Sequence, residues 1–435
     1  MKKLLFTGLL SLFIAGLFAQ DIKGIKKLYD KNDLSGAKNQ VDDFVQKNPT
    51  NPEGLYLKSK IYVAIAANDQ LKGSFPDARM AAFEAFKKSM DNSKGNVEYL
   101  RMMVTDQGFY KPLIDMYSGA YDVAAAIFNS AAGKGNKAEF EQAMNMFINA
   151  NTIGNYIAEQ KLGLSALDTN LVLNIGKAAI NAGKSDMALI YLKKMADANI
   201  KGTKDGAVGY ELPYQWLTLN YKNAKDEENM RKYAALGKQF FPKDDYYDAV
   251  MLDFYRDKKD HDALFRQYQV MTTKYPDSLN YHFNYANDAF NFIYNGDDGA
   301  KLSNREELLK TIDAELSKAN KINPNDVNTN WLYGQFFYNK GVDIKEQARA
   351  IKGTIPADVK KKTDLNAQAA SAFKEAIPFV EKAMATLEAN SKKSDKSRYK
   401  SISDLMQRVY GGLQQSDKVK IYQAKYDSAD TKFVN

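Results

Sequence analysis

The sequence predicts an all-α protein made of stacked helix–turn–helix units. The main observation is a self-similarity at an interval of 34 residues: Pro242 and Pro276 form one such pair, and Tyr221 and Tyr255 form another. A period of this length is typical of repeats in which each unit is one pair of helices. Because one pair cannot bury its apolar face alone, such chains stack neighbouring pairs into a solenoid. We therefore expect a right-handed superhelix of about eight helix pairs.

The composition supports this fold class and argues against an enzyme. Hydrophobic residues make up 45% of the 435 residues and prolines number only 10, which suits a mostly helical protein with an ample core. The chain has no cysteine, and therefore no disulfide framework, thiol nucleophile or thiolate metal site. Its two histidines, His261 and His282, fall on different repeats, whereas most zinc sites and hydrolase triads need more histidine. We predict a non-enzymatic protein with no catalytic residue, metal or cofactor.

The first 19 residues have the pattern of a secretory signal peptide. Lys2 and Lys3 precede an apolar run from Leu4 to Phe18, and the small residue Ala19 follows. The run is shorter than the roughly 20 apolar residues that span a bilayer. We expect cleavage after Ala19 and a periplasmic or otherwise extracytoplasmic protein. Since the chain has no cysteine, we do not expect a lipoprotein.

The predicted repeats after the signal peptide begin with two stretches. Residues 20–168 hold N-terminal repeats, in which Ala37 and Pro49 have the spacing of the small residue and the proline of later units. Residues 169–324 hold the clearest repeats. Pro242 ends a second helix there, because proline lacks an N–H and clashes with the preceding turn. Small residues such as Ala188 let neighbouring helices approach closely.

Residues 325–435 are expected to hold the last full repeat and a cap. Tyr333 and Gly334 begin the first helix of that repeat, and Ala376 marks its second helix. A final pair of helices, with Leu405 and Tyr422 on its apolar faces, has no repeat after it and therefore reads as a capping pair.

An insertion at residues 341–368 separates the two helices of the last repeat and carries a basic run, Lys360-Lys361-Lys362. The run is either a solvated loop or a contact for an acidic partner or anionic membrane surface. The formal charge of the chain is +8, and residues 340–400 alone hold 14 basic and 8 acidic side chains. Because the excess charge is local, we expect no nucleic-acid partner.

Four segments of the chain resemble exported tetratricopeptide-repeat proteins of Bacteroidota: KSKIY at 58–62, AFEAFKK at 82–88, FYNKG at 337–341 and AIPFVEKA at 376–383. The resemblance covers nearly all of the mature chain. It implies a right-handed α-solenoid whose concave groove holds other molecules, and it implies no settled activity.

In such a solenoid the inner positions of each first helix line the concave groove. Asparagine is frequent at these positions here, and its side chain both donates and accepts hydrogen bonds, as a peptide backbone does. Neighbouring aromatic residues offer apolar pockets. The candidate groove residues are Lys177, Asn181, Lys222, Asn223, Arg256, Phe283, Asn287, Asn291, Trp331, Gln335, Tyr338 and Asn339.

The asparagines have a second interpretation. Asn181, Asn223 and Asn339 are expected near turns, where asparagine tolerates a left-handed backbone and ends a helix. Asn291 has helix continuing beyond it, so capping explains it less well.

Two functions follow from these residues. The first is a non-enzymatic exported scaffold that binds protein segments in its concave groove, within a cell-envelope assembly. The alternative is a periplasmic protein that binds a small molecule or glycan in an aromatic pocket of Phe283, Trp331 and Tyr338. A long open channel favours a peptide, and a closed aromatic pocket favours a sugar.

Overall fold

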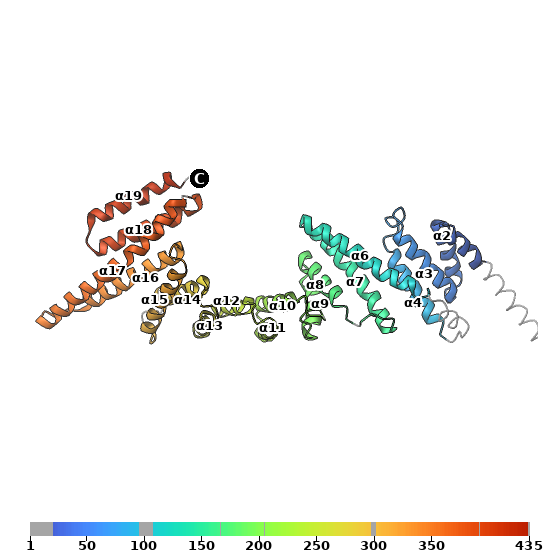
Figure 1. The fold of residues 1–435 in the computed structure, drawn as a ribbon, viewed down its shortest axis with the longest axis horizontal. Coiled ribbons are helices and arrows are strands. Elements are labelled where there is room, and N and C mark those ends of the chain that lie inside the picture. Colours follow the sequence, from blue (N-terminus) through green and yellow to red (C-terminus); the bar gives the residue numbers. More distant parts are fainter. Residues whose placement is uncertain are drawn as a thin grey trace, which may run out of the picture. The chain divides into compact units, whose positions relative to one another are not determined.

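The computed structural model describes residues 21–94, 108–165, 167–203, 205–296, 302–390 and 392–433. The expected signal peptide, residues 1–19, lies outside the described residues. Within these ranges the regular elements are helices, apart from one isolated β-bridge between Gly202 and Gly209 (Figure 1). The all-α prediction is confirmed.

The chain divides into two compact units, Met1–Tyr247 and Asp248–Asn435. In the first unit a helix at 21–30 is followed by α2 (Leu34–Lys47), α3 (Pro52–Ala67), α4 (Ala78–Asn92), α6 (Lys111–Lys134), α7 (Lys137–Glu159), α8 (Thr169–Ala182), α9 (Ser185–Asp197), α10 (Glu211–Asn223) and α11 (Glu227–Phe240). Helix α12 (Tyr246–Lys258) begins at the boundary.

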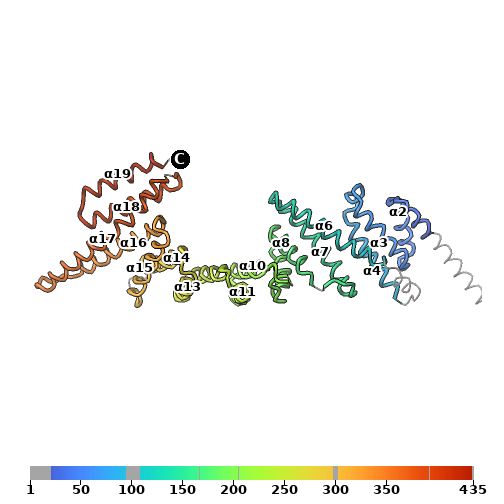
Figure 2. The backbone as a smooth tube through the Cα atoms, viewed as in Figure 1, coloured from blue at the N-terminus to red at the C-terminus, as the bar shows by residue number. Residues whose placement is uncertain are grey.

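The second unit continues with α13 (His261–Lys274), α14 (Leu279–Tyr294), α15 (Arg305–Ile322), α16 (Val327–Ala350), α17 (Pro356–Asn390), the short 3₁₀ helix η2 (Lys393–Asp395), α18 (Lys396–Gly412) and α19 (Ser416–Lys432). Figure 2 follows the backbone through these successive helices. Across the described ranges, eight consecutive helix pairs, from 21–30/α2 to α16/α17, precede the final pair α18/α19. This agrees with the predicted number of repeats and with the predicted capping pair.

Local sequence signals set the helix boundaries. Side chains such as Asp168 and Asp326 accept a backbone N–H from the first turn of the helix that follows them. Gly183 ends α8 with a φ of +75°, a left-handed conformation that glycine adopts readily. Pro242 and Pro276 each follow closely on the end of a second helix, α11 and α13. The predicted turn positions are thus where the helices stop.

Small residues lie where the helices of a pair cross. Ala188 and Ala376 are fully buried. A Cβ added to Gly176 would lie 2.3 Å from Leu192, and one added to Gly334 would lie 2.3 Å from Val380. A larger residue at either glycine would have to displace the facing side chain, Leu192 or Val380.

Replacing Ala376 by leucine should lower the free energy of unfolding by about 1–3 kcal/mol, because the added atoms overpack the α16/α17 contact. Ala367→Leu on the exposed face of the same helix is the control and should have little effect. Thermal unfolding followed by circular dichroism measures both variants. Equal melting temperatures for the two would mean that the helix register is misassigned.

The expected insertion at 341–368 is helical along most of its length. Helix α16 continues to Ala350 and α17 starts at Pro356, so the two form one long antiparallel pair (Figure 1). Gly341 lies inside α16, where a Cβ would come within 2.6 Å of the Phe373 ring. This glycine therefore permits close helix packing and does not end a helix. Lys360, Lys361 and Lys362 are solvent-exposed, but the prediction that they lie in a loop was wrong, because all three belong to α17.

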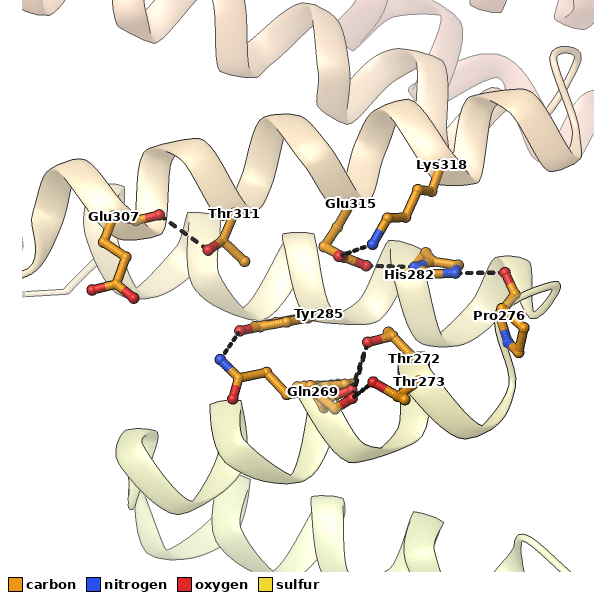
Figure 3. Close-up of polar contacts among 11 residues, drawn as sticks. Gln269, Thr272, Thr273, Pro276, His282, Tyr285, Glu307, Thr311, Glu315 and Lys318 are labelled. Atoms are coloured by element: carbon orange, nitrogen blue, oxygen red, sulfur yellow. Dashed lines mark hydrogen bonds and ion pairs between the residues drawn. The ribbon is translucent and has the colours of Figure 1, made fainter.

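A buried polar chain joins α14 to α15 in the second unit (Figure 3). His282 is 1% exposed; its Nε2 lies 2.8 Å from the carbonyl oxygen of Pro276, and its Nδ1 contacts a carboxylate oxygen of Glu315. The ammonium of Lys318 lies 2.8 Å from the other oxygen of Glu315. A carbonyl can only accept, so Nε2 carries hydrogen and donates to Pro276. His282 thus ties the start of α14 to α15.

No helix among the described residues is both long enough and apolar enough to cross a membrane.

Candidate functional site

Half of the predicted groove residues line one hollow of about 450 Å³ in the second unit. We call it the α14/α16/α18 groove, after the helices that supply its lining. The predicted residues in it are Asn287, Asn291, Trp331, Gln335, Tyr338 and Asn339. The structure therefore brings together the inner faces of two predicted repeats.

Helical periodicity explains why these side chains share a surface. Trp331, Gln335 and Tyr338 recur at intervals of three or four residues on α16, so they lie on one face of the helix. Phe336 and Phe337 are buried in the core from the other face. On α14, Asn287 and Asn291 are likewise one turn apart. Burial of the aromatic face leaves the amide-bearing face to line the groove.

Three amide side chains of the groove have no hydrogen-bond partner within the described part of the chain: those of Asn287, Gln335 and Asn339. Each presents an N–H donor pair and a carbonyl acceptor. Asn339 was expected near a helix end, but α16 continues for another 11 residues, to Ala350. Capping therefore does not account for this asparagine.

Asn291 differs from the expectation. Its Oδ1 accepts a hydrogen bond from Nδ2 of Asn295, the residue that ends α14, at 2.8 Å. The side chain thus takes part in the helix terminus after all, because α14 stops only one turn beyond it. Its amide N–H groups have no protein acceptor in the described ranges.

The aromatic part of the lining comes from Phe290, Trp331 and Tyr338. Trp331 is partly buried against the core, and its indole N–H is buried without a partner in the part of the chain that the structure describes. The ring of Tyr338 lies 5.7 Å from that of Phe373 on α17. Phe283 is packed against the core and does not line the groove. The predicted pocket of three aromatic residues is therefore not assembled.

Helix α18 forms a third wall of the groove, for which the sequence predicted no residue. It contributes Ser401, Asp404, Leu405 and Arg408. The guanidinium of Arg408 lies 2.9 Å from the carboxylate of Asp404, so the wall carries a paired charge. These residues recur at the intervals that place side chains on one face of a helix, and this spacing could have indicated the third wall from the sequence. The helix was predicted to be part of the capping pair, and no site residue was predicted on it.

Arg256 is held in an ion-pair network. Its guanidinium lies 2.9 Å from Asp288 and 2.6 Å from Asp253, and it also donates to the hydroxyl of Tyr268 at 2.8 Å. Burial opposes its charge, but the hydrogen bonds to Asp288 and Asp253 outweigh burial and raise the pKa of Arg256. Arg256 borders a separate hollow of about 560 Å³ that shares Asn291 with the groove. It acts as a bridge between α12 and α14.

The remaining predicted residues belong to the first unit. Lys177 and Asn181 lie on α8, and Lys222 and Asn223 lie on α10. The Asn181 amide donates to the carbonyl of Lys177 at 2.9 Å, within the last turn of α8. Asn223 is the last residue of α10. For these two asparagines the geometry fits the helix-end interpretation.

Within the described ranges, no group of three or more His, Asp or Glu side chains could hold a metal ion. The groove itself contains no histidine, and its acidic residue, Asp404, is paired with Arg408. The arrangement suits hydrogen bonding to a bound molecule.

No family model and no curated protein sequence matches this chain. Similar solved structures include the human IFIT1 dimer with m7Gppp-AAAA, at 10% identity over 88% of this chain and 90% of that chain, with a TM-score of 0.27. Yeast Tom70 is 8% identical over 94% of this chain and 96% of that chain, with a TM-score of 0.27. The Cut9–Hcn1 hetero-tetramer of APC/C is 11% identical over 95% of this chain and 74% of that chain, with a TM-score of 0.28. The fold class is carried by the helix pairs described above and not by these similarities.

Proposed function

We propose that this protein is a non-enzymatic helical-repeat scaffold that binds an extended protein segment in the α14/α16/α18 groove. The observation that carries the proposal is the row of unpaired amides, Asn287, Gln335 and Asn339, along one hollow. An extended peptide offers unpaired backbone N–H and C=O groups, and an amide side chain matches both at once. Trp331 and Tyr338 supply apolar surface for the side chains of the peptide.

The same lining argues against the glycan alternative. Sugar stacking would need aromatic faces around a closed pocket, and Phe283, the third expected ring, packs into the core. Five amide side chains and the paired Asp404–Arg408 supply most of the polar lining of the groove. This chemistry suits a peptide backbone better than a sugar ring.

The proposed setting is the cell envelope. The order of charged, apolar and small residues at positions 2–19 supports export, followed by cleavage after Ala19. The exposed lysines 360–362 on α17 supply a basic surface for an acidic partner. N-terminal sequencing of protein released by osmotic shock tests the export proposal. A chain that starts at Gln20 supports it, and one that still starts at Met1 contradicts it.

The groove is tested with a peptide selected from a random library against the mature protein. Asn287→Ala should weaken binding of the selected peptide about fivefold, because one hydrogen bond is worth about 1 kcal/mol. The control is Asn284→Ala, which removes an exposed amide from the same helix outside the groove. Calorimetric titration compares both variants with the wild type. Equal affinity for wild type and Asn287→Ala would place the peptide elsewhere.

A further inference from the structure

A larger hollow, of about 630 Å³, lies in the first unit. Its walls come from the helix at 21–30, from α3, from the start of α4 and from α6. Val63 and Ala64 of α3 give it an apolar floor, and the rings of Tyr29 and Tyr56 border it. We call it the Arg79 hollow. None of the predicted groove residues lies in it.

Arg79 is the informative residue of this hollow. It is partly buried, and its guanidinium has no hydrogen bond or ion pair within the described ranges. Burial lowers the pKa of Arg79, while the charge of Asp122 acts in the opposite direction. A guanidinium has five N–H donors, and removing it from water without an anion is unfavourable. The side chain is therefore in place for an anionic partner that the described residues do not supply.

Gly119 makes room for this guanidinium. A Cβ at position 119 would lie 2.8 Å from Nη2 and 3.2 Å from Nε of Arg79. Gly119 is in the middle of α6, where alanine is the better helix former. The missing side chain thus lets the Arg79 head lie against the helix and face the hollow.

The other charges of the hollow leave a local excess of cation. The Lys60 ammonium lies 5.6 Å from the centre of the Tyr29 ring and 5.9 Å from that of Tyr56, and it has no ion pair in the described part of the unit. Lys111 is paired with Asp115. Asp122 is exposed and interacts with the charge of Arg79, but it accepts no hydrogen bond from Arg79. Among the residues that the structure describes, the hollow therefore holds two cations without an ion pair, Arg79 and Lys60, and one such carboxylate, Asp122.

We propose that the Arg79 hollow binds a carboxylate side chain of an extended acidic protein segment. Arg79 donates to both carboxylate oxygens, Lys60 adds positive charge, and the floor of Val63 and Ala64 contacts the methylene groups of a bound glutamate. The carboxylates of Asp115 and Asp122 disfavour a doubly charged phosphate more than a singly charged carboxylate. This site is separate from the α14/α16/α18 groove and does not depend on it.

The test uses a labelled, end-blocked pentaglutamate peptide, with pentaglutamine as its neutral match, and fluorescence polarisation at low salt. Arg79→Ala should weaken pentaglutamate binding about tenfold or more, since hydrogen bonds to charged groups are stronger than neutral ones. Gly119→Ala should weaken it as well, because the new Cβ displaces the guanidinium while the net charge stays the same. Asp122→Asn should tighten it by removing the competing carboxylate.

The matched control is Lys310→Gln/Lys418→Gln/Lys420→Gln, which removes three exposed positive charges in the other unit and should leave the affinity unchanged. Circular dichroism verifies that each variant is folded. The proposal is overturned if Gly119→Ala binds like the wild type, if pentaglutamine binds equally well, or if Asp122→Asn does not bind more tightly. Displacement of the peptide by an equal concentration of inorganic phosphate would also overturn it.

Discussion

Replacing Glu315 by alanine is expected to lower the free energy of unfolding of the second unit by about 3–5 kcal/mol, the usual cost of removing one partner from a buried pair. The carboxylate lies between the His282 ring and the Lys318 ammonium (Figure 3). Without it, Nδ1 of His282 stays buried and unpaired, because its residue is only 1% exposed. The contact between α14 and α15, on which the groove depends, is weakened in consequence.

The measurement is urea unfolding followed by Trp331 fluorescence in a Trp216→Phe background. Trp216 lies in the first unit, so the remaining tryptophan reports only on the second. Glu307→Ala, at an exposed site on the same helix, is the control; its carbonyl bond to Thr311 survives the substitution. Equal urea midpoints for Glu315→Ala and Glu307→Ala would show that the buried pair does not hold the unit together.

The triple variant Asn287→Ala/Gln335→Ala/Asn339→Ala should lower the affinity for a groove-bound peptide about 100-fold. Each lost hydrogen bond is worth about 1 kcal/mol, and a 1.4 kcal/mol change is about tenfold in the dissociation constant. The free energy of unfolding should change little, because none of the three amide side chains forms a hydrogen bond with the described part of the protein. Loss of binding with an unchanged melting temperature is therefore the expected pair of results.

A second triple variant, Asn284→Ala/Gln347→Ala/Gln368→Ala, is the matched control. It removes the same number of exposed amides from α14, α16 and α17, at positions that do not line the groove. Its affinity should equal that of the wild type. If both triple variants lose binding equally, the contact is a general property of the surface and not of the groove.

The features that follow from residue spacing along the chain could be predicted from the sequence. The spacing of Pro242 and Pro276 gave the repeat length, and small residues such as Ala376 marked helix contacts. Counting along α14 and α16 also found the groove face, because residues three or four apart share a face whatever surrounds the helix.

The particular side chains that meet across two helices could not be predicted in this way. Gly341 was predicted to begin an insertion, because its close approach to Phe373 exists only in the folded helix pair. Arg256 was predicted to be a groove residue, because the sequence does not show that Asp288, on another helix, pairs with it. The Arg79 hollow draws its lining from four separate segments, so no single stretch of sequence indicates it.

The most direct test of the central claim is a fluorescence titration of the Trp216→Phe protein, in which Trp331 is the single tryptophan. Trp331 lines the groove, so a peptide bound there changes its surroundings. The account predicts a saturable change in Trp331 emission on addition of the selected peptide, with a dissociation constant equal to that from calorimetry. In the reciprocal Trp331→Phe protein, Trp216 should show no change. A saturable change at Trp216, with Trp331 silent, would place the peptide in the first unit and contradict the assignment of the groove.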